Sequence, residues 1–421
     1  MSQKFSGVKG MNDLFAPEMD VWQHVEAQAR EHFRRFGYSE IRTPVLEDTA
    51  LFVRSVGEET DIVGKEMYTF EDKGGRSLSL RPEGTAPAAR AYIEHALLNR
   101  EPVTRWFYAG PMFRYERMKT GRYRQFYQLG IEAYGVKEPA QEVEQMDLVH
   151  SLLTSLGLQG VRLNLNSLGD ASCRPAYLEK LLGYLNAHVA ELCADCQTRL
   201  TKNPLRVLDC KNPGCQAVVA NAPSVLENLC DPCQVHFAEV RRQLELLAIP
   251  YDLNPRMVRG LDYYTRTAFE FIAEDPVLGT ASAVGGGGRY DAMVRGLGGP
   301  DVPAVGLALG WDRLCLLLAK NAARYTARPA LFVVTQDAKA QDEAIQLVSR
   351  LRKEGLAVDF DTRGGSLKSQ MKRADKSGAR FALVMGENEL AKQEGQLKPM
   401  SGGDVIAAPF AELAALLKKH A

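Results

Sequence analysis

Residues 258–271 gather side chains that could do chemistry at the entrance of a predicted strand. Two guanidiniums, two adjacent phenols and a carboxylate fall within eight residues, namely Arg259, Asp262, Tyr263, Tyr264 and Arg266. A strand that only filled a core would not need them. The four glycines at 285–288 would let a backbone approach a ligand closely. We therefore expect these two segments to form walls of a pocket for a small polar molecule; a surface hairpin with a polar tip is the alternative.

A second set of residues suits the binding of a nucleotide. Arg114, Glu116, Arg122 and Phe126 follow one another around a basic loop. An arginine can hold a phosphate bidentately and stabilise charge at a reacting phosphorus. We expect Glu116 on the same strand face as Arg114, where it could accept from an adenine amino group, and Phe126 offers a stacking plane. A cross-strand salt bridge beside a core phenylalanine would explain any one of these residues, but it explains the set poorly.

Glycines also precede a predicted helix near residue 311. Gly306 and Gly310 are followed by Arg313, which falls in the first turns of that helix. Small residues and the helix dipole both favour a phosphate at such a position. Helix packing is the alternative explanation for the glycines.

The cysteines suggest a metal. Cys193-x-x-Cys196 and Cys230-x-x-Cys233 bracket Cys210 and Cys215. Paired CxxC motifs are typical of structural tetrahedral zinc. The hypothesis is one zinc ion bound by Cys193, Cys196, Cys230 and Cys233, and the alternative is a set of small buried residues.

Three kinds of local pattern predict the elements that position these residues. An apolar stripe predicts a helix over 17–36, and a hairpin over 65–81 leads to Glu83, with Thr85 capping a helix over 86–98. Strands are predicted at 105–114 and 122–132, and a strand at 38–47 is broken by Pro44. A helical, cysteine-bearing insertion over about 170–243 interrupts the β pattern, which resumes near 251.

Beyond a linker at 321–329, strands and helices alternate. We expect strands at 331–335, 358–360 and 381–385, helices between them, and a last helix over 410–419. This pattern predicts a small α/β domain over 329–421 with a largely parallel sheet, after a domain over 1–325.

Composition is that of an ordinary soluble protein. The 421 residues have zero net charge, 45% hydrophobic and 25% charged residues. No apolar run reaches transmembrane length, and the N-terminus lacks a signal peptide's apolar segment, so we expect a cytoplasmic protein with no membrane partner.

The motifs resemble those of a known family. Thr43-Pro44, the Arg114/Glu116/Phe126 set and the turn ending at Arg313 resemble the three motifs of class II aminoacyl-tRNA synthetases, in that family's order. The stretches 259–264 and 286–291 resemble two that are peculiar to histidyl-tRNA synthetases, and 80–85 and 122–126 also match. The resemblance covers nearly the whole chain. It implies an α+β fold: a class II synthetase-type antiparallel sheet flanked by helices, a helical insertion and a C-terminal α/β anticodon-binding domain.

The resemblance also implies roles. ATP and L-histidine would form histidyl-adenylate with Mg²⁺ assisting, and tRNA(His) would then be charged. Arg114 and Arg259 would be the catalytic residues at the α-phosphate. The ATP-binding residues would be Arg114, Glu116, Arg122, Phe126 and Arg313. The histidine-binding residues would be Glu83, Gly84, Thr85, Gln128, Glu132, Tyr263, Tyr264, Gly286 and Tyr290, with Glu132 and Tyr264 reading the imidazole.

The resemblance further implies a homodimer with Pro44 at its interface, and tRNA contacts from the last domain. Lys368, Lys372, Arg373 and Lys376 recur at helical spacing and could face phosphates; an ordinary solvated helix face is the alternative. The loop 117–120 departs from the family's usual sequence, and we expect Arg117 and Lys119 there to contact phosphate at most.

Two other functions share parts of this pattern. A catalytically inactive, synthetase-like regulatory subunit of ATP phosphoribosyltransferase should lack the C-terminal domain and the arginines at 259 and 313. A tRNA-binding module fused to a kinase should carry a kinase segment. We expect neither, because this chain has the arginines and the last domain and shows no kinase segment.

Overall fold

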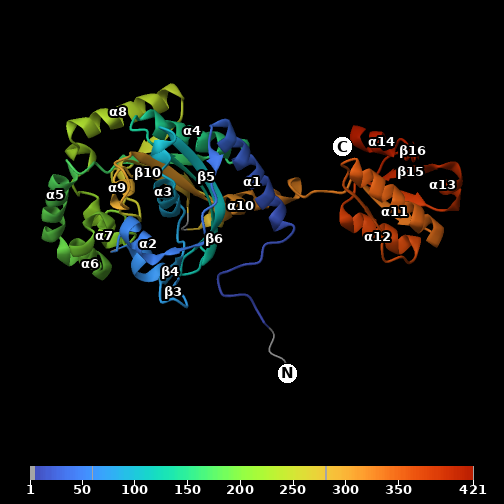
Figure 1. The fold of residues 1–421 in the computed structure, drawn as a ribbon, viewed down its shortest axis with the longest axis horizontal. Coiled ribbons are helices and arrows are strands. Elements are labelled where there is room, and N and C mark those ends of the chain that lie inside the picture. Colours follow the sequence, from blue (N-terminus) through green and yellow to red (C-terminus); the bar gives the residue numbers. More distant parts are fainter. Residues whose placement is uncertain (1–4, 59, 280–281, 421) are drawn as a thin grey trace. The chain divides into compact units, whose positions relative to one another are not determined.

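An antiparallel sheet organises the first of two units in the chain, which comprise Met1–Tyr325 and Thr326–Ala421. The computed structural model describes residues 5–58, 60–279 and 282–420. Within them the large sheet has eight strands, in the order β1-β5-β6-β11-β10-β9-β7-β8 (Figure 1). Their bounds in that order are Ser39–Glu40, Thr104–Phe113, Gln125–Tyr134, Ala304–Gly310, Ala283–Arg289, Thr265–Ala273, Val161–Ser167 and Tyr251–Leu253. Only the outer pairs β1–β5 and β7–β8 are parallel, so the antiparallel α+β fold is confirmed.

The two faces of this sheet differ, because side chains alternate along each strand. On β6, Leu129 and Ile131 enter the main apolar core, while Gln128 and Glu132 point to the opposite face. Four helices contribute to the main core: α1 (Glu18–Arg35), α4 (Ala140–Ser155), α8 (Asp231–Leu246) and α10 (Trp311–Leu318). The opposite face carries α3 (Thr85–Glu94) and α9 (Met293–Gly296). The polar residues of interest therefore lie on the α3 face.

A smaller sheet carries the predicted hairpin. It consists of β2 (Leu46–Asp48), β3 (Thr69–Glu71) and β4 (Ser77–Leu80), in the order β2-β4-β3. Asp72 closes the turn between β3 and β4, since its Oδ1 accepts from the backbone N–H of Gly74 at 2.8 Å. The helix α2 (Thr49–Val56) and a π-helical turn, Ile62–Glu66, lie beside this sheet in the chain.

Two local expectations are wrong. The strand β5 ends at Phe113, so Arg114 and Glu116 both lie in the loop that follows and do not share a strand face. Thr85 does not cap α3: it is the first helical residue, and its hydroxyl turns to Glu132. The Glu83 carboxylate takes that place, accepting from the N–H groups of Thr85 and Ala86, both at 2.8 Å.

The insertion is helical, as predicted. It contains α5 (Arg174–Ala187), α6 (Ala194–Lys202), α7 (Pro213–Val219) and α8, and it has an apolar core of its own that includes Tyr177 and Leu181. Short 3₁₀ turns lie within or near it at Val189–Glu191, Pro204–Val207 and Leu226–Asn228, and elsewhere in the unit at Leu97–Asn99, Pro276–Leu278 and Ala319–Arg324.

The second unit is an α/β domain. Its sheet has the order β13-β12-β14-β15-β16, with bounds Val358–Phe360, Leu331–Thr335, Phe381–Met385, Glu394–Pro399 and Ile406–Pro409. The helices are α11 (Ala338–Lys353), α12 (Leu367–Ser377), α13 (Glu387–Lys392) and α14 (Leu413–Lys419). The three predicted strands pair in parallel, but β15 and β16 add an antiparallel half, so "largely parallel" is wrong. Their Gly, Pro and Lys content hides them from a propensity-based prediction.

Candidate active site

A cavity of about 200 Å³ lies on the α3 face of the large sheet. Most of the predicted site residues line it: Glu83, Thr85, Arg114, Glu116, Arg122, Phe126, Gln128, Arg259, Tyr263, Tyr264, Gly286 and Arg313. Gly84, Glu132 and Tyr290 do not line it; Glu132 and Tyr290 are buried directly behind its wall. Residues as far apart in the chain as Glu83 and Arg313 thus meet in one site.

Small residues on two strands make room for the cavity. On β11, the positions that face the site are Gly306, Ala308 and Gly310. Gly306 pairs with Glu132, and a Cβ at Gly306 would lie 1.6 Å from Glu132 Oε2. A Cβ at Gly286 would lie 2.6 Å from Arg259 Nη1. A side chain at either position would displace a charged group of the site.

Glu132 is the centre of a buried hydrogen-bond network. Thr85 Oγ1 donates to its Oε1 at 2.7 Å, Tyr108 OH donates to the same oxygen at 3.2 Å, and Tyr290 OH donates to Oε2. Burial raises the pKa of Glu132 to about 8, although the hydroxyl donors oppose the shift. The network fixes the carboxyl group and leaves it able to hold a proton near neutral pH.

Glu83 is the second buried carboxyl group, only 3% exposed. Burial raises its pKa, against the two backbone N–H groups at the start of α3. One buried carboxyl group that lines the cavity, and a second that bonds Thr85 behind its wall, suit a ligand that brings positive charge and hydrogen-bond donors.

Arg259 lies between a carboxylate and an aromatic ring. Its Nη1 donates to Glu270 Oε1 at 2.7 Å, and its Cζ lies 5.8 Å from the ring centre of Tyr264. Tyr263 packs against Tyr264 at 4.6 Å and against Tyr290 at 5.6 Å between ring centres. The phenols therefore brace the guanidinium and form one side of the cavity.

The loop after β5 carries three of the predicted nucleotide residues, Arg114, Glu116 and Arg122, and Phe126 follows at the start of β6. Arg114 Nε donates to the Pro82 carbonyl at 2.8 Å, and its Cζ lies 5.2 Å from the ring centre of Phe126. Arg122 Nη1 donates to Glu116 Oε2 at 3.0 Å. A base could stack on the ring of Phe126 while the guanidinium beside it reaches a phosphate.

Arg313 enters from the first turn of α10. Its Nε donates to the Gly121 carbonyl at 3.0 Å, which joins the helix to the loop between β5 and β6. Asp312 lies beside it and accepts from the backbone N–H of Tyr127 at 2.7 Å. Burial raises the pKa of Asp312 to about 6. The arginine thus holds the loop at the cavity while staying charged.

Several polar atoms of the cavity lack a partner among the described residues. They are Arg259 Nε, Arg122 Nε and Gln128 Oε1, and all three are buried. Buried polar atoms are normally hydrogen-bonded, so unpaired ones in a single cavity mark it as a binding site for a polar ligand.

A larger hollow of about 1490 Å³ adjoins the cavity and shares Arg259 and Arg313 with it. Its other wall belongs to the insertion, which contributes Arg199, Lys202, Arg206 and Lys211. The small cavity therefore adjoins a larger hollow whose lining has ten arginines and lysines against seven carboxylates, an excess that favours an anionic partner.

Sequence reasoning missed Glu270 and Tyr108. Glu270 was detectable, because the alternation that sends Phe269 and Phe271 to the core places Glu270 on the face of the site. Tyr108 sits in an aromatic strand, Arg105-Trp-Phe-Tyr108, where nothing local distinguishes it from a core residue.

The predicted zinc ligands do not come together as one set. Cys193 and Cys196 cluster with Cys210 and Cys215, whereas Cys230 and Cys233 cluster with Asp170 and Cys173. The single shared site expected from the two CxxC motifs is replaced by two separate groups, and neither Asp170 nor Cys173 was expected to take part.

Among the described residues, none of the helices is long and apolar enough to cross a membrane.

Residues 10–314 match the family model for histidyl-tRNA synthetase, and residues 330–420 match that for an anticodon-binding domain. Histidine–tRNA ligases are similar over nearly the full length. That of Anaeromyxobacter dehalogenans (strain 2CP-1) is 51% identical over 98% of this chain and 99% of its own. That of Geobacter metallireducens is 48% identical over 96% of this chain and 98% of its own.

Solved structures of related proteins are also similar to this chain. The apo histidyl-tRNA synthetase of Staphylococcus aureus superposes with a TM-score of 0.82 at 35% identity, covering 99% of this chain and 100% of that one. A Bacillus halodurans protein described as an ATP phosphoribosyltransferase regulatory subunit/histidyl-tRNA synthetase has a TM-score of 0.65 at 21% identity, over 89% of this chain and 97% of that one. The second likeness shows a common fold only.

Proposed function

This chain belongs to the histidyl-tRNA synthetase family of class II aminoacyl-tRNA synthetases, and we propose that the 200 Å³ cavity is where it activates histidine. It is a histidine–tRNA ligase that couples the cleavage of ATP to AMP and pyrophosphate to the charging of tRNA(His). The observation that carries the assignment of the site is the meeting of Arg114, Arg259 and Arg313 with the buried carboxyl group of Glu83 in one cavity, behind whose wall Glu132 bonds Thr85.

In the first step, a carboxylate oxygen of histidine attacks the α-phosphorus of ATP. A P–O bond forms to the amino acid and the P–O bond to pyrophosphate breaks, giving histidyl-adenylate. Charge accumulates on the non-bridging oxygens, where Arg114 and Arg259 stabilise it. Arg122 and Arg313 bind the pyrophosphate end of ATP. Phe126 stacks on the adenine, and Glu116 accepts a hydrogen bond from its amino group.

Histidine is read by complementary groups. Glu83 and Gln128 face its ammonium group, with Thr85 fixed between Glu83 and Glu132. Glu132 and Tyr264 face the imidazole, while Tyr263, Tyr290, Gly84 and Gly286 shape the wall. A site built to hydrogen-bond both ring nitrogens rejects analogues that leave its groups unpaired, by about 10⁴-fold or more.

Magnesium fits this donor set as a partner of the nucleotide. Mg²⁺ is usually bound by one or two carboxylates together with phosphates and water. Glu270 is the carboxylate that lines the cavity beside Arg259, with which it is already paired. It would hold an ion that arrives with ATP, and that ion would neutralise the pyrophosphate leaving group.

In the second step, a hydroxyl at the 3′ end of tRNA(His) attacks the carbonyl carbon of the adenylate, and AMP leaves. The hollow that adjoins the cavity, which is lined by more arginines and lysines than carboxylates, would take the acceptor end of the tRNA. The anticodon-binding domain supplies Lys368, Lys372 and Lys376, which lie exposed at four-residue spacing on α12. Arg373 does not belong to this stripe, because it bonds Asp361, Gly364 and Ser369 within the domain.

Histidine-dependent exchange between ATP and pyrophosphate, followed by tRNA(His) charging, tests this function. The regulatory-subunit alternative shares the fold, so the fold cannot separate the two functions, but a regulatory subunit would show neither reaction. The retention of Arg259 and Arg313 at the cavity supports the enzyme. Folded protein without exchange would contradict it.

The chain is proposed to act as a homodimer. Apolar side chains are exposed near Pro44: Val45 is 37% and Leu46 is 41% exposed. Phe15 is 72% exposed in the N-terminal segment. Exposed apolar residues of this size favour a protein partner. Light scattering should give twice the 46.6 kDa of one chain, and a monomer at micromolar concentration would refute the dimer.

A further inference from the structure

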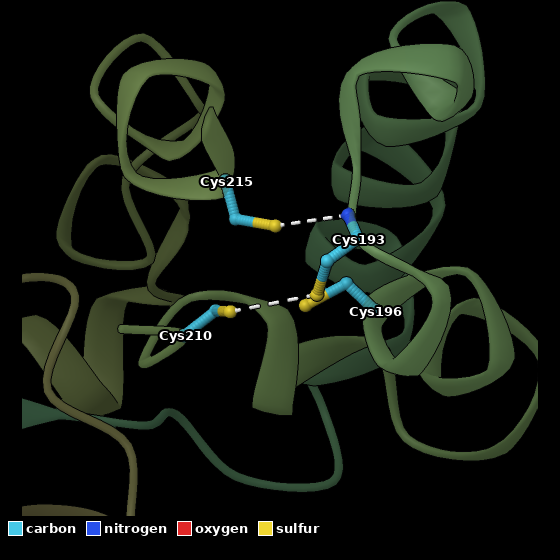
Figure 2. Close-up of side chains that lie close together, drawn as sticks. All are labelled: Cys193, Cys196, Cys210 and Cys215. Atoms are coloured by element: carbon cyan, nitrogen blue, oxygen red, sulfur yellow. Dashed lines mark hydrogen bonds between the residues drawn. The ribbon is translucent and has the colours of Figure 1, made fainter. Parts of the chain in front are cut away.

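The insertion contains a cluster of four cysteines contributed by three segments. Cys193 and Cys196 lie at the start of α6, Cys210 lies in the loop that follows, and Cys215 lies on α7. Figure 2 shows their side chains turned toward a common point. Cys196 and Cys215 are fully buried, and all four are free thiols in the structure.

The spacing of the sulfur atoms matches a metal site, and the structure joins none of the four cysteines in a disulfide. Cys193 Sγ lies 3.9 Å from Cys210 Sγ, and all four sulfurs lie within 4.8 Å of one another (Figure 2). A tetrahedron with Zn–S bonds of about 2.3 Å has sulfur–sulfur edges of about 3.8 Å. A disulfide needs a separation of about 2.05 Å.

A second cluster lies elsewhere in the insertion. Cys173 Sγ lies 3.9 Å from Cys233 Sγ, and Cys230 Sγ lies 3.9 Å from Asp170 Oδ1. The four ligand atoms of Asp170, Cys173, Cys230 and Cys233 again lie within 4.8 Å of one another. This arrangement offers three sulfurs and one carboxylate oxygen.

The same local structure builds both clusters. Cys193 and Cys230 are N-cap residues with nearly identical backbone angles, φ −66° and ψ 158° against φ −70° and ψ 159°. The second cysteine of each CxxC therefore falls at the third helical residue, so both sulfurs meet at a helix N-terminus. The positive end of the helix dipole favours thiolates there.

Backbone N–H groups also point at the sulfurs. Cys193 N donates to Cys215 Sγ at 3.2 Å, Asn212 N donates to Cys210 Sγ at 3.5 Å, and Asp170 N donates to Cys173 Sγ at 3.4 Å. Such donors stabilise negatively charged sulfur and orient it, as the outer partners of metal ligands do.

From these two clusters we infer that the insertion binds two structural zinc ions, one through Cys193, Cys196, Cys210 and Cys215 and one through Asp170, Cys173, Cys230 and Cys233. Each set has four ligands and leaves no open position, as structural rather than catalytic zinc requires. Both ions reinforce a helical module whose apolar core is small, a size at which domains commonly depend on metals or disulfides.

The second ion also anchors the histidine pocket. Asp170 Oδ2 accepts from Arg266 Nη2 at 3.2 Å, and Arg266 has a left-handed backbone, with φ 51°. Arg174, one residue after Cys173, donates to the Tyr264 carbonyl at 2.6 Å. The metal would thus hold the insertion against the segment that carries Tyr263 and Tyr264.

Metal counting on the full chain tests the proposal. Protein purified without chelators should contain about two zinc ions per chain. Cys210→Ser and Cys173→Ser should each remove about one ion, and the double variant both. Cys315→Ser is the matched control, because Cys315 is buried in α10, outside both clusters, and the count should stay unchanged.

A measurement on the unaltered protein covers the case in which a variant fails to fold. Replacing zinc by Co²⁺ should give two bound ions with thiolate charge-transfer bands, one spectrum typical of four sulfurs and one of three sulfurs and an oxygen. Folded protein with no metal and freely reactive thiols would overturn the proposal. So would a single ion lost in both variants, or iron in place of zinc.

Discussion

Arg259 Nη1 lies 2.7 Å from Glu270 Oε1, on adjacent parts of one loop–strand unit, while Arg259 Nε has no partner among the described residues. Glu270 therefore fixes one edge of the guanidinium and leaves the rest of it available. A charged group held in place before substrate arrives needs no reorganisation during reaction, which is what stabilisation of a transition state requires.

The affinity for histidine should fall above about pH 8. Burial raises the pKa of Glu132 to about 8, so below that pH the empty pocket holds a proton that the substrate's imidazole can share. Above it the proton must come from solvent, and KM for histidine should rise about tenfold per pH unit. KM for ATP should stay level over the same range.

Glu132→Gln separates this effect from the titration of histidine itself. The amide keeps the shape of the carboxyl group but cannot ionise, so the rise centred near pH 8 should vanish, leaving only the rise due to the substrate's amino group. A variant with the same profile as the unaltered enzyme would show that Glu132 is not the titrating group.

A buried ion pair should control the stability of the first unit. Arg289 Nη1 lies 2.7 Å from Glu142 Oε2, both residues are fully buried, and His236 of the insertion bonds the same carboxylate at 2.8 Å. Glu142→Gln removes the buried carboxylate that pairs with the Arg289 guanidinium. This loss should lower the free energy of unfolding by about 3 kcal/mol.

Glu144→Gln on the same helix is the control. Its partner Arg105 lies 3.2 Å away and is about one-third exposed, so the loss should stay below about 1 kcal/mol. Urea unfolding followed by tryptophan fluorescence reports on this unit alone, because all three tryptophans, Trp22, Trp106 and Trp311, lie in it. Equal losses in both variants would contradict the account.

The exposed lysines of α12 should matter for tRNA and not for adenylate formation. Replacing Lys368, Lys372 and Lys376 by alanine should raise KM for tRNA(His) and lower the slope of log KM against log salt by about 2 to 3. ATP–pyrophosphate exchange should be unchanged. Alanine at the exposed Lys339, Lys353 and Lys418 removes equal charge from other helices and should leave the slope nearly intact. Equal effects of the two triple variants would indicate a general electrostatic attraction.

Much of the site was predictable because many of its residues lie within short, recognisable sequence motifs. Arg114, Arg259 and Arg313 each lie in a short stretch with a recognisable pattern, and all three line the cavity. Period-two alternation also placed Phe269 and Phe271 in the core correctly. Local pattern and local structure agree at these positions.

The errors arose where long-range contacts decide. Cys230 and Cys233 meet Asp170 and Cys173 about sixty residues earlier in the chain, and no spacing rule reveals such a pairing. Thr85 was predicted to cap the helix, but its hydroxyl donates instead to Glu132, which the sheet brings close to it. Glu116 left the expected strand because β5 ends at Phe113, where the chain turns into the loop.

Single-turnover kinetics of Arg259→His test the central claim most directly. A guanidinium at the reacting phosphate should be worth about 10²- to 10³-fold in the rate of adenylate formation. The rate should fall by that factor, while the dissociation constants for histidine and ATP change much less. An unchanged rate would show that Arg259 is structural and that Arg114 alone serves the phosphate.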